Sequence, residues 1–193
     1  MNLVLSVLRQ PESIRQLGPS EWDLLIRQCR HANLLGRLHE RLRAAGLEAE
    51  IPDRPRNHLQ SGAFMAEQQQ FSIRREASFL REALAPYEIP VILLKGAAYV
   101  AAGLPAAQGR LFADVDILVP HDRLGTAESA LMLTGWQSTV SDAYDQRYYR
   151  RWMHELPPLI HAERDRMVDV HHTILPLTAA PKPDAASPCP NNK

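Results

Sequence analysis

The first 85 residues carry apolar side chains at helical spacing. In residues 19–46, PSEWDLLIRQCRHANLLGRLHERLRAAG, the spacing is that of one helix face, with Ser20 as a capping residue and Gly46 as a stop. This pattern predicts two short helices or one broken helix. After the break IPDRPR, residues 57–85 predict one long helix, so the first region is expected to be entirely helical.

The hydrophobic period changes after residue 85. The runs IPVILLKG and VDILV are short, continuously apolar and rich in β-branched residues, which predicts two buried strands. AAYVAAG between them predicts a short helix closed by Gly103, and RLGTAESALMLTG predicts a helix with Asp122 near its start and Gly135 after its end. LPPLIHAERDRMVDVHHTIL predicts two strands joined as a hairpin at residues 163–166. The expected fold class is therefore α+β.

These patterns divide the chain into three parts. Residues 1–85 form a helical region that is expected to pack on the core, residues 86–178 form an α/β core, and residues 179–193 form a proline-rich tail that is expected to be disordered. With 193 residues, 45% of them hydrophobic, the chain can bury one sizeable core.

The net charge and the cysteines indicate which binding partners and which cellular compartment to expect. The 22 basic residues balance the 22 acidic ones, so no overall field draws the protein onto DNA, RNA or an acidic membrane. Cys29 and Cys189 lie far apart, which does not suggest a disulfide framework, and no stretch has the pattern of a leader or a membrane span. The expected location is the cytoplasm, without membrane contact.

Two aspartates in RLFADVDILVP are the first candidates for chemistry. Residues i and i+2 of a strand face the same side, so Asp114 and Asp116 project together at the start of a predicted strand. Two such carboxylates repel each other unless a cation lies between them, and oxygen ligands suit Mg²⁺ or Mn²⁺. The alternative is a solvated turn with two surface aspartates.

The segment LLKG, residues 93–96, is a candidate phosphate-binding turn. A strand that ends in Lys95 and Gly96 and leads into a helix presents free backbone N–H groups to an anion. The chain has 19 arginines and three lysines, and Lys95 is the one lysine outside the predicted tail. A compact point charge for a phosphate explains this choice, although a surface lysine in an arginine-biased chain is the alternative. The spacing is not that of a P-loop.

A third carboxylate lies in MVDVHH, residues 167–172. Asp169 sits in mid-strand, where a carboxylate is normally paired or metal-bound, and strand alternation places His171 on the same face. Together with Asp114 and Asp116, it completes the ligand set of a two-metal site for phosphoryl chemistry. We interpret His171 as a neighbour of Asp169 or of a metal, with a plain core histidine as the alternative. No zinc-type Cys/His spacing occurs, so a structural zinc site is not expected at the histidines of this region, His154, His161, His171 and His172.

Three motifs in this order resemble the DNA polymerase β-type nucleotidyltransferase superfamily. They are Leu-Lys-Gly, an arginine shortly before Asp-x-Asp, and a distant aspartate in a strand that is followed by Val-His. The resemblance covers residues 85–178 and is closest to an uncharacterised bacterial nucleotidyltransferase group found in biosynthetic gene clusters. It extends more loosely to abortive-infection nucleotidyltransferase toxins. It implies a small mixed sheet flanked by helices.

The resemblance also implies roles for individual residues. Asp114 and Asp116 match the metal-binding pair, and Asp169 matches the third carboxylate, which deprotonates the acceptor hydroxyl. Gly96 matches the glycine of the phosphate-binding turn, and the positions near the triphosphate are matched by Lys95 and Arg110. The superfamily usually has Gly-Ser where this chain has Gly96 followed by alanine, so a serine contact to phosphate is missing.

The implied function is Mg²⁺-dependent or Mn²⁺-dependent transfer of a nucleoside monophosphate from a nucleoside triphosphate to a hydroxyl. The acceptor is open among RNA, protein and small molecules. The alternatives are a nucleotide-binding or interaction module of the same fold that does not turn over, and one half of a toxin–antitoxin pair. A further stretch, RYYRRWMHE at residues 147–155, predicts an amphipathic helix with aromatic side chains packed inward, or, less favoured, a base-stacking surface.

Overall fold

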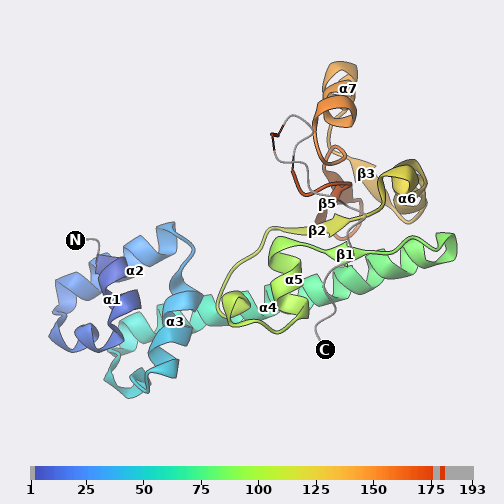
Figure 1. The fold of residues 1–193 in the computed structure, drawn as a ribbon. Coiled ribbons are helices and arrows are strands. Elements are labelled where there is room, and N and C mark those ends of the chain that lie inside the picture. The colour runs from blue at the N-terminus through green and yellow to red at the C-terminus, as the bar shows by residue number, and fades with distance from the viewer. Residues whose placement is uncertain (1–2, 176–178, 181–193) are drawn as a thin grey trace. The chain divides into compact units, whose positions relative to one another are not determined.

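The chain divides into two units in the computed structural model, which describes residues 3–175 and 179–180 (Figure 1). The first unit comprises Met1–Ser72 and Ala102–Phe112, and the second comprises Ile73–Ala101 and Ala113–Lys193. The sequence predicted a division at residue 85, and that domain boundary stays a prediction. Residues 181–193, most of the predicted tail, lie outside the described residues.

The first unit is helical and encloses an apolar core. Its elements are α1 (Leu3–Arg9), the 3-10 helices η1 (Pro11–Gln16), η2 (Glu48–Glu50) and η4 (Pro105–Ala107), α2 (Pro19–His31), α3 (Leu35–Ala44) and the first part of α4 (Asp53–Leu84). The core side chains are Val4, Val7, Ile14, Trp22, Leu25, Ile26, Cys29, Leu38, Leu42, Leu47, Ile51 and Leu59. The two predicted helices and the long helix are confirmed.

The start of α2 differs in detail from the sequence-based expectation. Gly18 occupies the N-cap position, and its N–H donates to the Glu21 carboxylate at 2.8 Å. Pro19 takes the first helical position, where its missing N–H costs nothing. The assignment of Ser20 as the capping residue was therefore wrong, because Ser20 lies inside the helix.

Three glycines allow close backbone packing in the first unit. A Cβ on Gly36 of α3 would lie 2.7 Å from the carbonyl oxygen of Gly109 and 2.9 Å from that of Gly62 in α4. Gly109 also has a φ of 64°, which a side chain would strain. The helix pair and the 102–112 segment can approach this closely only because all three residues lack side chains.

The second unit is built on a five-stranded mixed sheet in the order β1-β2-β5-β4-β3. Only β2 and β5 run parallel, and the other neighbouring pairs are antiparallel. The strands are β1 (Ile92–Leu93), β2 (Asp114–Leu118), β3 (Trp136–Ser138), β4 (Leu159–His161) and β5 (Met167–His171). The predicted hairpin is confirmed, because β4 pairs with β5 across residues 162–166. The short strand β3 was not predicted.

The helical elements of the second unit are the remainder of α4, η3 (Ala85–Tyr87), α5 (Lys95–Ala101), η5 (His121–Arg123), α6 (Leu124–Leu133) and α7 (Ala143–Trp152). Both α5 and α6 match the predicted short helices. The left-handed backbone at Gly103 and Gly135, with φ of 63° and 97°, lets the chain turn after them. A mixed sheet with flanking helices confirms the α+β fold class.

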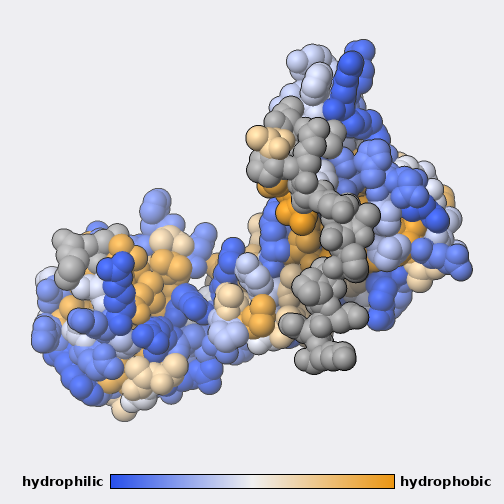
Figure 2. All heavy atoms as spheres, in the orientation of Figure 1, coloured by the Kyte–Doolittle hydropathy of each residue, from blue (hydrophilic) through white to orange (hydrophobic). Residues whose placement is uncertain are grey.

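Helix α7 contradicts the prediction of inward-packed aromatic side chains. It has no buried residue, and Tyr144, Tyr148 and Trp152 keep 71%, 46% and 49% of their surface exposed. Figure 2 shows hydrophilic and intermediate residues over α7 on the face in view. The helix begins at an Asp142 cap that accepts from two backbone N–H groups, so its start does not depend on packing.

Among the residues that the structure describes, no helix combines the length and the apolar character needed to cross a bilayer.

Candidate active site

Three aspartates share one face of the central parallel strand pair. Asp116 of β2 lies opposite Asp169 of β5 in the parallel register, and Asp114 is two residues before Asp116. Because side chains alternate along a strand, all three project to one side of the sheet. The intervening residues project to the other side and are buried there: Val115, Ile117, Val168 and Val170. We call Asp114, Asp116 and Asp169 the aspartate triad.

The aspartate triad has the donor set of a divalent cation site. Each residue offers one carboxylate oxygen, and the three oxygens lie within 4.8 Å of one another. Asp116 is buried, Asp169 is half-buried and Asp114 is the most exposed, so the site opens to solvent on one side. Three carboxylate oxygens at this separation suit a hard ion such as Mg²⁺ or Mn²⁺.

Asp169 is electrostatically unfavourable as an anion in this setting. Burial raises the pKa of Asp169 to about 6, and the charges of Glu155, Asp114 and Asp116 add to the effect. A cation bound between the carboxylates would relieve the repulsion and lower this pKa again, so the residues present fit a divalent metal ion.

Asp116 is held by two donors on one oxygen. The Lys95 ammonium donates to Oδ1 at 2.6 Å, and Nε2 of His171 lies 3.0 Å from the same atom. Burial alone would raise the pKa of Asp116, but the hydrogen bonds from His171 and Lys95 outweigh burial and lower it. Hydrogen bonding to Asp116 likewise raises the pKa of the Lys95 ammonium. Asp116 therefore stays ionised although it is buried.

Lys95 reaches Asp116 because of the backbone at the start of α5. The Leu94 N–H donates to the Asp116 carbonyl at 2.9 Å, which fixes the end of β1 beside β2. Lys95 then adopts a left-handed conformation with φ of 44°. For a residue with a side chain this conformation costs about 1–2 kcal/mol, and such strain is concentrated at functional sites. The sequence suggested Gly96 as the special residue of this turn, whereas the left-handed residue is Lys95.

Arg110 lies in the first unit, and the aspartate triad lies in the second. The guanidinium of Arg110 stands over the ring of Phe112, 5.2 Å from its centroid. The structure thus brings together Lys95, the aspartate triad and His171, all of which belong to one unit.

Two residues that were not predicted as site residues also lie here. Glu155 forms an isolated β-bridge with His171, and its Oε2 lies 3.2 Å from Nδ1 of His171. His154 lies next to both, with Nε2 3.7 Å from the same oxygen. Burial lowers the pKa of His154. No local spacing could have revealed this cluster, since it forms only when the segment after α7 meets the end of β5.

Comparison with known proteins identifies the family of the chain. The model of a family described as uncharacterised nucleotidyltransferase matches residues 18–190, which is most of the chain. No curated protein matches the chain, and no solved structure does. The fold and the family agree with a general role in nucleotidyl transfer. The chain belongs to the uncharacterised nucleotidyltransferase family.

Proposed function

We propose that this protein transfers a nucleoside monophosphate from a nucleoside triphosphate to a hydroxyl acceptor, with Mg²⁺ or Mn²⁺ held by Asp114, Asp116 and Asp169. The supporting observation is the set of three carboxylate oxygens within 4.8 Å on adjacent parallel strands. Membership of a nucleotidyltransferase family supports a triphosphate as the donor.

The proposed reaction gives Asp169 a role different from that of Asp114 and Asp116. Asp169 accepts the proton of the acceptor hydroxyl as the general base. The hydroxyl oxygen then forms a bond to the α-phosphorus, and the bond from that phosphorus to the bridging oxygen breaks, which releases pyrophosphate. Asp114 and Asp116 would hold the cation together with Asp169. When bound, the divalent cation neutralises charge on the triphosphate and the leaving group.

Lys95 and Gly96 are proposed to bind the triphosphate. The Lys95 side chain keeps 61% of its surface exposed, so its ammonium can turn from Asp116 toward a phosphate oxygen. Gly96 follows it at the start of α5 and is buried, without a side chain that would cover the turn. Arg110 belongs to the other unit, and its role at the triphosphate stays a prediction from the sequence.

A non-catalytic nucleotide-binding module is the alternative, and two observations favour it. Asp116 already has two donors on Oδ1, and the residue after Gly96 is Ala97, which offers no hydroxyl to a phosphate. In that case a nucleotide would bind, but no nucleoside monophosphate would be transferred to an acceptor and no pyrophosphate would be released.

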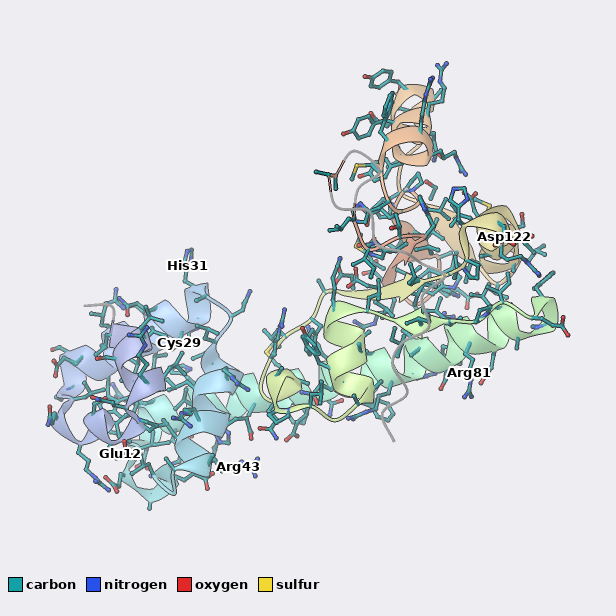
Figure 3. The ribbon with its side chains drawn as sticks, viewed as in Figure 1. Glu12, Cys29, His31, Arg43, Arg81 and Asp122 are labelled. Atoms are coloured by element: carbon teal, nitrogen blue, oxygen red, sulfur yellow. The ribbon has the colours of Figure 1, made fainter. Side chains whose placement is uncertain are left out.

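The test compares two aspartate variants in the same unit. Asp114→Asn removes the most exposed ligand of the triad, and Asp122→Asn is its control, an exposed aspartate in η5 (Figure 3). The thermal unfolding midpoint of each protein is measured with Mg²⁺ and each of the four nucleoside triphosphates. A ligand at 100 times its dissociation constant stabilises the native state by about 2.7 kcal/mol, which raises the midpoint by several degrees.

We expect one triphosphate to raise the midpoint of the wild type and of Asp122→Asn in the presence of Mg²⁺, and not that of Asp114→Asn. Pyrophosphate release from that triphosphate, screened with RNA, protein and sugar acceptors, then separates catalysis from binding. If nucleotide raised the midpoint of Asp114→Asn as much as that of the wild type, the triad would not be the nucleotide and metal site. A shift without pyrophosphate release across the screen would favour the non-catalytic module.

A further inference from the structure

A second cluster of metal-binding residue types lies beside the aspartate triad. It consists of His154, Glu155 and His171, and we call it the histidine cluster. His154 and Glu155 follow α7, whereas His171 ends β5. The two segments are held together by backbone contacts: Glu155 bridges with His171, and the His172 N–H donates to the His154 carbonyl at 2.9 Å. The geometry of the cluster is therefore fixed by the sheet.

The three side chains converge on one point. One ligand atom from each lies within 4.8 Å of the others. The Glu155 oxygen is 3.2 Å from a nitrogen of His171 and 3.7 Å from a nitrogen of His154. The imidazole rings lie 5.1 Å apart between centroids, tilted by 33°. A tetrahedral zinc ion with bonds of about 2.0–2.2 Å to nitrogen and oxygen needs ligand atoms slightly more than 3 Å apart.

An unsatisfied buried nitrogen points to a ligand in this position. The His171 side chain is only 1% exposed, and its Nδ1, although 3.2 Å from Glu155, makes no hydrogen bond. Nδ1 of His154 is also buried without a hydrogen-bond partner. A buried polar atom left without a partner destabilises the fold. A cation that accepts the lone pair of His171 removes this destabilisation and neutralises Glu155 as well.

The opposite nitrogen of His171 is already oriented as in a metal site. Nε2 of His171 lies 3.0 Å from Asp116 Oδ1, so this nitrogen can donate its N–H to the carboxylate. Metal-binding histidines commonly donate the second ring N–H to a carboxylate, which fixes the tautomer and leaves the other nitrogen free for the metal. His171 thus links the two clusters.

We infer that His154, Glu155 and His171 bind a divalent transition ion of the zinc type, separate from the ion at the aspartate triad. Two imidazoles and one carboxylate form a known zinc donor set, with a fourth position open. The aspartate triad offers only oxygens and favours Mg²⁺ or Mn²⁺. The different donors allow the two sites to select different ions. This inference does not depend on nucleotidyl transfer by the triad.

The test measures zinc bound to the full chain in excess Mg²⁺, which occupies sites made of oxygen alone. The protein is stripped with a chelator, re-equilibrated with zinc chloride, desalted and analysed for zinc by elemental analysis. We expect one zinc per chain in the wild type and in Asp114→Asn. We also expect it in His31→Ala, a control that removes an exposed histidine at the end of α2 (Figure 3). His154→Ala and Glu155→Gln should lose stoichiometric zinc.

A rescue variant separates ligation from folding. Glu155→His keeps three donors and should retain zinc, whereas Glu155→Gln supplies only a weak amide ligand. Far-ultraviolet circular dichroism in metal-free buffer checks that each variant is folded. Absence of zinc from the wild type, or undiminished zinc in both His154→Ala and Glu155→Gln, would overturn the inference. So would zinc that is lost in Asp114→Asn and kept in His154→Ala, because the ion would then belong to the triad.

Discussion

The two units bury different kinds of side chain. The first unit encloses apolar residues such as Leu25, Leu38 and Leu42, each with no exposed surface. Among the described residues, every buried polar or charged side chain lies in the second unit: Glu76, Asp116, Glu128, His161, His171 and His172. Apolar burial stabilises a fold, whereas buried polar groups are costly unless paired. The second unit therefore carries the buried groups that need partners.

A second contrast lies inside the second unit. Glu76 is fully paired, with three hydrogen bonds from Arg164 at 3.0–3.1 Å, and Glu128 receives two from Arg150 at 2.6 and 2.8 Å. The aspartate triad has one lysine for three carboxylates, and the pKa of Asp169 rises to about 6 mainly because of burial. The charges of Glu76 and Glu128 are thus balanced within the chain, whereas the triad has more carboxylates than cationic partners.

The largest expected effect is in the apolar core of the first unit. Leu38→Ala should lower the free energy of unfolding by about 2–5 kcal/mol, because it leaves a cavity in a fully buried position. Leu24→Ala, at a leucine that is 40% exposed, is the control and should change it by less than about 1 kcal/mol. Urea denaturation measures both. The increase in unfolding midpoint caused by nucleotide should persist in Leu38→Ala. Loss of this increase would show that the core of the first unit affects the nucleotide site of the second.

The next effect compares one ion pair from each unit. Glu76→Ala should cost on the order of 3 kcal/mol, since it leaves Arg164, whose side chain is 27% exposed, without its partner in a largely buried position. Glu50→Ala removes the partner of Arg15 in the first unit, where both side chains are solvent-exposed, and should have no measurable effect. Denaturant titration of the two variants measures both changes in the free energy of unfolding. Equal losses would mean that burial does not distinguish the two pairs.

The smallest effect concerns the unbalanced charge of the triad. An aspartate has a pKa near 3.9 in an unfolded chain, and that of Asp169 is about 6 in the fold. Between these values the native state holds a proton that the unfolded state has released, so this group's contribution to stability falls as pH rises through the interval. Asp169→Asn should therefore be about 1–2 kcal/mol more stable than the wild type at pH 7 in chelator. The difference should shrink toward pH 4.

Urea titrations of Asp169→Asn and the wild type at several pH values measure this difference. Added Mg²⁺ should reduce it by stabilising the wild type alone. A difference that is constant from pH 4 to pH 7 would show that the Asp169 carboxylate does not carry the electrostatic cost.

Local patterns in the sequence account for much of the fold. Helical spacing gave the two helices before residue 46 and the long α4, because apolar periodicity reports which face of a helix is buried. Continuous apolar runs gave β1 and β2, and the hairpin segment gave β4 and β5. The prediction of a buried strand in IPVILLKG was wrong in part, because β1 has only two residues and Ile92 is 55% exposed. The brief strand β3 has too few residues for a pattern, and its pairing with β4 forms it.

Side-chain burial was less predictable where a helix leaves the body of its unit. The alternation of arginine and aromatic residues in α7 is typical of an amphipathic helix, yet no residue of α7 is buried. An amphipathic pattern shows only that a helix has an apolar face. Whether that face meets the same chain, a partner or solvent depends on contacts that the pattern does not contain.

The sequence by itself determined that Asp114 and Asp116 share a strand face and that Asp169 and His171 share another, because side-chain alternation is a local property of any strand. Only the tertiary structure decided that the strands pair in parallel with Asp116 opposite Asp169, that Lys95 reaches Asp116, and that His154 and Glu155 meet His171. These contacts join residues far apart in the chain, and their register is set by the packing of the whole sheet rather than by neighbouring residues.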